Sequence, residues 1–350
     1  MARTLALNIS LSRGDSPHGS RRKLCSASYG GTFSNLKEGD RSMDASSMSS
    51  LVEAEAQHQA RRGLALYLAA VVVLTALFDV LVITFSPLWI LGRMFAPAAA
   101  SVVARLVLRE GFADVSFRFG GRQTWRVILL ALVFPVIIGL VAYGIAWATG
   151  LAQFDPEPSA GLFARLAGEV TSSPAMMFVI MLILTTFVWV FPSAFFAAGE
   201  EIGWRGYMLT RLIDAGVPRP VLVSGLIWGL WHIPLVLAGV YVAGENRYVS
   251  AVLLMVSVTS VGFVIARMRL ETGSIWPAIA LHGAWNSTIQ TAFDPATTSS
   301  GAGVTLWVGE AGILTALALV VAAIIFSRGR WTIRRAPEAQ QGEVAPSPAL

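Results

Sequence analysis

The sequence predicts an all-α, polytopic membrane protein with about eight transmembrane helices around a buried polar site. Of its 350 residues, 55% are hydrophobic and 13% are charged, whereas soluble domains average about 25% charged residues. Apolar runs of spanning length, about 20 residues each, recur from Gly63 onward. A few acids, imidazoles and amides interrupt these runs, where ionised groups are costly and therefore usually functional.

The apolar runs form one predicted domain of residues 61–327. The second run contains Arg93 and Pro97 and is the least regular, while the fourth continues as a helix to about residue 212. The predicted spans are residues 64–86, 88–108, 127–149, 175–199, 220–242, 248–268, 274–292 and 304–327.

The segments that flank this domain are polar. Residues 1–60 are rich in Ser, Gly and charge, without sustained periodicity, and are predicted to be a disordered cytoplasmic leader. Residues 328–350 are predicted to be a basic, then disordered cytoplasmic tail. Within the domain, Glu310, Asp79 and Arg93 are interpreted as structural charges, the last two paired with each other or snorkelling.

The loop arginines predict the orientation. If the amino terminus is cytoplasmic, fourteen arginines flank the spans on the inside and two on the outside, a strong positive-inside bias. The inside set is Arg61, Arg62, Arg109, Arg118, Arg122, Arg126, Arg211, Arg219, Arg267, Arg269, Arg328, Arg330, Arg334 and Arg335, and the outside set is Arg165 and Arg247. Both termini are therefore expected in the cytoplasm. The excess of Arg over Lys and the abundant Ala indicate a GC-rich bacterial genome, hence a bacterial inner membrane.

The net charge of +5 does not indicate a nucleic-acid partner. The only lysines are Lys23 and Lys37, and most arginines lie at the ends of apolar segments, which is typical of topology determinants. The single Cys25 excludes an internal disulfide and a thiolate metal site. The expected surroundings are the lipid bilayer and a membrane-associated substrate.

The stretch from Phe195 to Tyr207 carries two adjacent carboxylates and an arginine at the end of a long apolar run. Glu201 and Arg205 are one helical turn apart, the spacing at which side chains of one helix meet. Glu200 points about 100° away from Glu201 on a helix of 3.6 residues per turn. We therefore interpret Glu201–Arg205 as a neutralising, positioning pair and Glu200 as the working acid.

Two further spans carry rare polar side chains at a similar depth. His232 lies in the fifth predicted span, and His282 and Asn286 share one face of the seventh. At about 1.5 Å per residue, Glu200, His232 and His282 lie about 18, 20 and 12 Å from the cytoplasmic ends of their segments. This agreement predicts one hydrated cavity that opens toward the cytoplasm.

A glutamate, two histidines and an asparagine at one dry site suit hydrolysis. A buried carboxylate can act as general base toward water, while imidazole and carboxamide donors stabilise the oxyanion formed from a peptide carbonyl. Alternatively, Glu200, His232 and His282 could hold a divalent metal such as zinc, with water in the open position. The chain has no His-Glu-x-x-His and no Gly-x-Ser-x-Gly motif, so the common zinc-protease and serine-hydrolase signals are absent.

Three motifs follow one another on separate spans: Glu200-Glu201-x-x-x-Arg205, Trp228-x-x-x-His232 and His282-x-x-x-Asn286. In this order and spacing they resemble the CPBP family, which comprises intramembrane proteases related to the type II CAAX prenyl endopeptidase and to bacteriocin-immunity proteins. The resemblance covers about residues 61–327, with the motifs confined to about 199–286. It implies the same eight-helix fold.

The resemblance also implies roles for the polar set: Glu200 as the group that activates water, Glu201 and Arg205 as its orienting pair, and His232, His282 and Asn286 as residues that line the site and stabilise the oxyanion. Trp228 is a departure, because the family more often has Phe at this position. The resemblance does not decide between a glutamate-dependent and a metal-dependent protease.

The implied function is an intramembrane endopeptidase that cleaves a membrane-associated peptide or protein, lipidated or not. Two rival functions stay open. Buried Glu, His and Arg could form the relay of a proton-coupled transporter, although the polar groups cluster on one side and no internal repeat is evident. A non-catalytic immunity or scaffold protein could keep the fold, but an idle site would have little physical reason to bury this polar set.

Overall fold

The computed structural model describes residues 45–157, 173–242, 244–299 and 303–329. Within these ranges the regular secondary structure is helical apart from one two-stranded sheet, which confirms the predicted all-α, polytopic fold class. The elements are α1 (Ala45–Thr84), η1 (Pro87–Trp89), α2 (Ile90–Arg93), α3 (Ala96–Leu108), η2 (Ala113–Val115), α4 (Arg122–Thr149), β1 (Gln153–Phe154), α6 (Pro174–Phe187), α7 (Val190–Gly203), η3 (Trp204–Met208), α8 (Leu209–Asp214), α9 (Pro220–Leu237), α10 (Arg247–Thr272), α11 (Trp276–Thr288), η4 (Ile289–Phe293), β2 (Thr297–Thr298), α12 (Val304–Trp307) and α13 (Ile313–Ser327).

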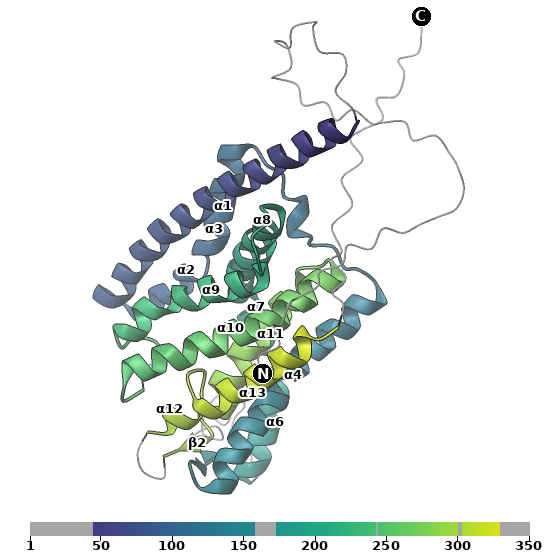
Figure 1. Ribbon diagram of the computed structural model, residues 1–350. Helices are drawn as coiled ribbons and strands as arrows, with labels where there is room; N and C mark the ends of the chain where they lie inside the picture. Colours follow the sequence, from purple (N-terminus) through teal and green to yellow (C-terminus); the bar gives the residue numbers. More distant parts are fainter. Residues whose placement is uncertain (1–44, 158–172, 243, 300–302, 330–350) are drawn as a thin grey trace, which may run out of the picture.

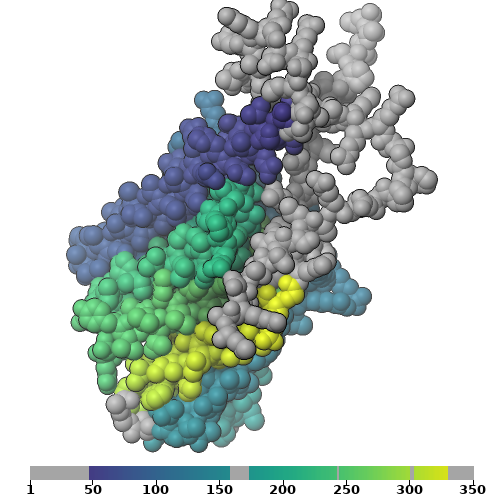
Figure 2. Space-filling model, viewed as in Figure 1, coloured from purple at the N-terminus to yellow at the C-terminus, as the bar shows by residue number. Residues whose placement is uncertain are grey.

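The long helices run side by side. Figure 1 shows α1, α9, α10 and α13 crossing the molecule in nearly the same direction. In the space-filling view of Figure 2 they form successive ridges over one face, in the order in which the helices contact one another. Helices α7 and α11 pack against each other. The site residues lie mainly on α7, α9 and α11, so this packing decides which polar side chains meet.

The predicted number of eight spans is not confirmed. Among the described residues, five helical segments are long and apolar enough to cross a membrane, and six if the bent pair Pro174–Phe187 and Val190–Asp214 is one span. The last predicted span, 304–327, is split between α12 and α13. Helix α13 has 15 residues, or about 22 Å, which is shorter than a hydrocarbon core of about 30 Å.

The seventh predicted span corresponds to α11 and η4. Most side chains of α11 are buried, and the helix packs against α4, α6, α7 and α10. A helix enclosed by protein can carry the polar residues of a site, because lipid does not contact them. An enclosed helix need not be as apolar as a helix in contact with lipid. The segment is accordingly not among the helices whose composition identifies them as membrane spans.

Helix α1 begins at Ala45, so the predicted disorder of residues 1–60 is wrong for residues 45–60. This stretch is rich in Ala, Glu and Gln, which are good helix formers, although it contains no continuous apolar run. Arg61 Nε donates to the carbonyl of Ala215 at 3.3 Å, which ties this end of α1 to the end of α8. The remaining leader, residues 1–44, and most of the predicted tail lie outside the described residues.

The fourth predicted span continues as a helix to Asp214 but bends by 44° at a break after Phe187. Pro192 accounts for the break. Its ring has no N–H and would clash with the carbonyl four residues earlier, that of Val188. Val188, the C-cap of α6, instead donates to Leu184 at 2.8 Å and closes the first helix.

The second predicted span is interrupted between α2 and α3. Arg93, the last residue of α2, forms an ion pair with Asp79 of α1 at 2.5 Å, the first of the two predicted alternatives. Its guanidinium also donates to the carbonyl of Trp231 on α9. This charge therefore joins three helices inside the protein instead of snorkelling to the surface.

Helix α7 crosses the interrupted segment at very close range. A Cβ atom at Gly199 would lie 2.7 Å from the carbonyl oxygen of Met94, and one at Gly203 would lie 2.5 Å from backbone atoms of Pro97. Real Cβ contacts essentially never reach such distances. The two glycines therefore allow the crossing that fixes the part of α7 between them, which carries both glutamates.

Candidate active site

Helix α7 and the π-helical segment η3 bury the two glutamates and the arginine. The exposed fractions of Glu200, Glu201 and Arg205 are 3, 0 and 1%. Arg205 donates to Glu201 Oε1 at 2.8 Å, and its guanidinium lies 4.0 Å from the ring centre of Trp228 on α9. Short π-helical segments occur frequently at functional sites. Here η3 begins directly after α7 and carries Arg205.

Glu200 has different partners, although it is adjacent to Glu201 in sequence. Its Oε2 accepts hydrogen bonds from the indole N–H groups of Trp228 at 2.9 Å and Trp204 at 3.3 Å. Its Oε1 lies 4.0 Å from Nε2 of His282. Two neutral donors therefore fix one oxygen of this carboxylate, and the other oxygen faces an imidazole.

His282 on α11 bridges the two glutamates. Its Nδ1 lies 2.8 Å from Glu201 Oε1, and because an ionised carboxylate only accepts, Nδ1 carries the hydrogen. Gly283 lets α11 come this close: a Cβ there would lie 2.7 Å from Cα of Ala194 on α7. The contact between the two helices thus sets the distance from His282 to Glu200.

His232 on α9 lies beside this cluster. Its Nδ1 is 2.9 Å from the carbonyl oxygen of Trp228, an acceptor, so Nδ1 carries the hydrogen and Nε2 is left for another partner. The imidazole stacks on Tyr241, with ring centres 5.7 Å apart. Within the described part of the chain no hydrogen bond joins His232 to either glutamate.

Asn286 follows His282 by one helical turn and is half-buried. It lines the same cavity as His232 and His282. Among the described residues its carboxamide makes no hydrogen bond, so both N–H donors can serve a ligand. The structure therefore brings all six predicted site residues into one region, but only Glu200, Glu201, Arg205 and His282 form a directly connected cluster.

A cavity that is partly open to its surroundings lies against this region. Its walls include Trp228 and both histidines, together with apolar side chains of α10 such as Leu254 and Val258. Glu200 is not among the lining residues. Trp228 and His282 lie next to its carboxylate and also form part of the cavity wall. The two side chains therefore lie between Glu200 and the cavity.

Sequence reasoning missed four features of the site. Trp204 and the indole N–H of Trp228 hold Glu200, and Tyr241 and Glu310 line the cavity. Trp204 follows Glu200 by four residues, the same spacing that identified the Glu201–Arg205 pair, so a search of donors at this spacing would have found it. No local signal relates Tyr241 to Glu310, which are 69 residues apart.

The metal-ligand set suggested by the sequence does not fit this arrangement. Among the described residues, no three His, Cys, Asp or Glu side chains are grouped so that they could hold a metal ion. The hydrogen bonds at Nδ1, to a carbonyl and to Glu201, leave Nε2 of each histidine as its possible metal ligand, so only the grouping of the side chains argues against this set. No step of the reaction below is therefore assigned to a metal.

Comparison with known families supports the motif analysis. Residues 182–288 match the family model described as Type II CAAX prenyl endopeptidase Rce1-like. This segment contains every predicted site residue, from Glu200 to Asn286. The family resemblance is therefore confirmed over the segment, and it supports a protease embedded in the membrane. No curated protein matches the chain.

Proposed function

We propose that the chain, whose residues 182–288 match this protease family, is an intramembrane endopeptidase in which Glu200 activates water to hydrolyse a peptide bond. One observation carries the proposal: Glu200 Oε1 is 4.0 Å from His282 Nε2. These two atoms are too far apart for a direct hydrogen bond, and we place the attacking water between them. Water at this position would have a carboxylate as acceptor for its proton.

The charges of the buried cluster support this assignment. Glu200 and Glu201 contribute two negative charges and Arg205 contributes one positive charge. A protonated His282 makes the cluster neutral, which lowers the free energy of burying it. His282 Nε2 then carries a hydrogen and can donate to the developing oxyanion.

In the proposed reaction the water oxygen bonds to the carbonyl carbon, while its proton passes to Glu200 Oε1. The carbonyl oxygen becomes an oxyanion that accepts hydrogen bonds from Asn286 and from His282 Nε2–H. When the C–N bond breaks, the leaving amine takes the proton from Glu200. Glu201 and Arg205 keep the imidazole of His282 in position.

His232 takes a different role from the one expected. With its hydrogen on Nδ1 and directed at a carbonyl, the neutral ring offers only an acceptor at Nε2. An acceptor cannot stabilise an oxyanion but can bind an N–H of the substrate backbone. We therefore assign His232 to substrate orientation.

The proposal is tested with the purified full chain in liposomes. The family description names prenyl endopeptidases, so prenylated peptides and unprenylated peptides of the same sequence are the first substrates. We expect cleavage that persists in the presence of a chelator. Loss of cleavage on chelation would contradict the glutamate mechanism, and proton flux without cleavage would favour the transporter. A chain that neither cleaves peptides nor conducts protons would favour the non-catalytic immunity or scaffold protein.

A further inference from the structure

We infer that the Glu310 end of the cavity binds a cationic group on an aliphatic stem, such as the lysine side chain of a substrate. This inference rests on the proposed protease function and adds a substrate preference to it. Glu310 lies between α12 and α13, is 6% exposed and lines the same cavity as His232, His282 and Asn286.

The carboxylate of Glu310 is held in place without being neutralised. Its Oε2 accepts from the hydroxyl of Tyr241, and its Oε1 accepts from Trp285 Nε1 at 2.9 Å and Gln290 Nε2 at 3.1 Å. All three donors are uncharged. They come from two separate parts of the chain, Tyr241 from the segment after α9 and the other two from the continuous α11–η4 segment, so the carboxylate has a fixed orientation at the cavity wall.

Two other buried carboxylates among the described residues have an arginine as partner. Asp79 pairs with Arg93, and Glu201 pairs with Arg205. Among the described residues Glu310 takes part in no ion pair. A buried charge without a counter-ion is unfavourable unless hydrogen bonds or a ligand compensate for it. A cation that enters the cavity would supply the missing charge.

The other walls of the cavity fit both the charged end and the aliphatic stem of a lysine side chain. Aromatic rings of Trp228, Tyr241 and Trp285 line it, and aromatic faces attract cations. Leu254 and Val258 add apolar surface, which suits a chain of methylene groups. An anionic substrate group would be repelled by Glu310.

The cation site adjoins the groups of the proposed reaction. Tyr241, which donates to Glu310, also stacks on His232. Trp285, the second donor, precedes Asn286 on α11. A lysine bound to Glu310 would therefore belong to a residue close to the scissile bond.

The test compares lysine with norleucine, which has a similar length and no charge, at each position of a peptide library. For the purified full chain we expect lysine to raise kcat/KM about tenfold at one position. In the isosteric Glu310→Gln variant, the ratio of kcat/KM for the lysine peptide to kcat/KM for the norleucine peptide should fall to about one. Glu310→Asp, which keeps the charge, should retain a lysine preference. An unchanged ratio in Glu310→Gln would overturn the inference, as would a wild-type chain without lysine preference at any position.

Glu157→Gln is the matched control, because it removes the same charge from an exposed side chain outside the cavity. We expect it to keep the wild-type ratio. Melting temperatures of the variants show that folded proteins are compared. A structural role of Glu310 alone would lower cleavage of lysine and norleucine peptides equally, which also contradicts the inference.

A binding measurement separates this inference from the protease proposal. Pentylammonium should raise the melting temperature of the full chain more than 1-pentanol at the same concentration, and Glu310→Gln should abolish the difference. Equal effects of the two probes on the wild-type chain would overturn the inference even if peptides are cleaved. A pentylammonium effect in a chain that cleaves no peptide would instead refute only the protease function.

Discussion

Glu200 and Glu201 show how two adjacent carboxylates on one helix acquire different properties. Glu201 has charged or chargeable partners, Arg205 and His282, both at 2.8 Å. Glu200 has two indole donors on one oxygen and an imidazole beyond hydrogen-bond distance from the other. Both partners of Glu201 bind Oε1 and hold this carboxylate in place, whereas Oε1 of Glu200 accepts no hydrogen bond within the described part of the chain and can receive a proton from water.

Trp228→Phe tests the role of the indole donors. The change keeps an aromatic ring beside Arg205 and His282 but removes the 2.9 Å hydrogen bond to Glu200. Hydrogen bonds to charged groups contribute about 1.5–3 kcal/mol, so we expect kcat to fall at least about tenfold. The measurement is kcat per folded protein in the peptide assay.

Trp147→Phe is the control for this prediction. It also removes one indole hydrogen bond, at 3.2 Å to Thr297, which lies outside the site. Its kcat should equal that of the wild type. An unchanged kcat in Trp228→Phe would show that the indole N–H does not orient Glu200.

At the scale of residues, the sequence allowed prediction of contacts within one helix and offered the Asp79–Arg93 pair as one of two alternatives, but the other contacts between helices were not predicted. The Glu201–Arg205 pair follows from a spacing of four residues. The stacking of Tyr241 on His232 and the donation of Tyr241 to Glu310 depend on how α9 and the segment before α13 meet. Glu310 was therefore assigned a structural role, although it lines the cavity.

At the scale of elements, the close crossing of α7 over the break between α2 and α3 determines where the glutamates lie. Gly199 and Gly203 bracket Glu200 and Glu201, and both lack room for a Cβ. The site thus depends on backbone contacts as well as on its polar side chains. A helix that could not approach the break would hold both carboxylates further from α9 and α11.

Gly203→Ala tests this crossing. The added methyl would meet backbone atoms of Pro97 at 2.5 Å, and forced overpacking typically destabilises by about 1–3 kcal/mol. We expect a lower melting temperature in detergent together with reduced cleavage. Gly144→Ala on α4 is the control, since a methyl group there would meet no other part of the described chain within 4 Å. If both variants melt at the same temperature, the close crossing is not a constraint.

The helices themselves were largely predictable, but their breaks were not. Hydropathy located most of the apolar segments, and the break at Pro192 has a local cause that the sequence contains. The break between α12 and α13 coincides with Gly309, Glu310 and Gly312, but a hydropathy average over the whole run masks these three residues. Helix α11 is the opposite case. It is enclosed by other helices, and its polar residues lower its mean hydropathy, so hydropathy does not identify it as a membrane span.

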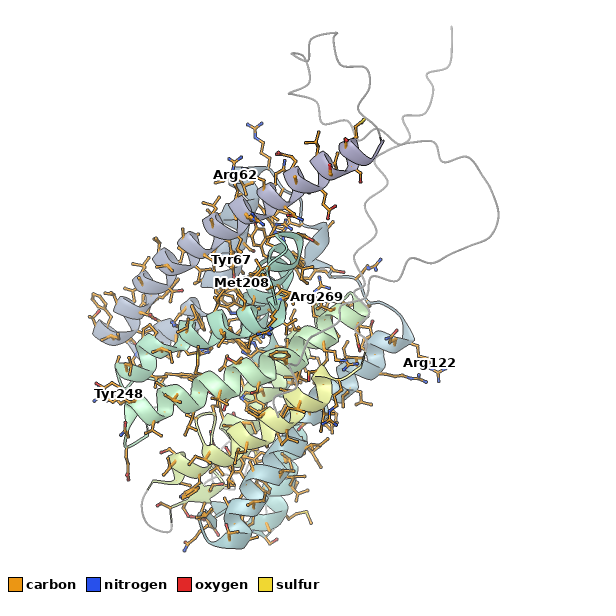
Figure 3. All side chains as sticks on the ribbon, viewed as in Figure 1. Arg62, Tyr67, Arg122, Met208, Tyr248 and Arg269 are labelled. Carbon is orange, nitrogen blue, oxygen red and sulfur yellow. The ribbon has the colours of Figure 1, made fainter. Side chains whose placement is uncertain are left out.

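At the scale of the whole molecule, the two ends of the bundle differ in charge. Figure 3 shows Arg122 at the start of α4 and Tyr248 at the start of α10 near opposite ends of the molecule. Arg122 belongs to the arginine-rich loops predicted to be cytoplasmic, and Tyr248 follows a loop with few basic residues. The positive-inside rule then predicts the orientation of the entire bundle.

Cysteine labelling tests this orientation. In a Cys25→Ser background, Tyr248→Cys should react with a membrane-impermeant maleimide in intact spheroplasts, since the native side chain is 76% exposed. Arg122→Cys, also at an exposed position, should react only after the membrane is permeabilised. The opposite pattern would place the termini outside and refute the predicted topology.

The most direct test of the account is the cleavage rate of a purified, folded Glu200→Gln variant, measured beside Glu157→Gln. Glutamine has the size of glutamate and can still accept from both indoles, but it cannot take a proton from water. Because general-base catalysis contributes about 10²–10⁴-fold, the account predicts a loss of at least about 100-fold for Glu200→Gln and no loss for Glu157→Gln. A Glu200→Gln variant that cleaves within about threefold of the wild-type rate would contradict it.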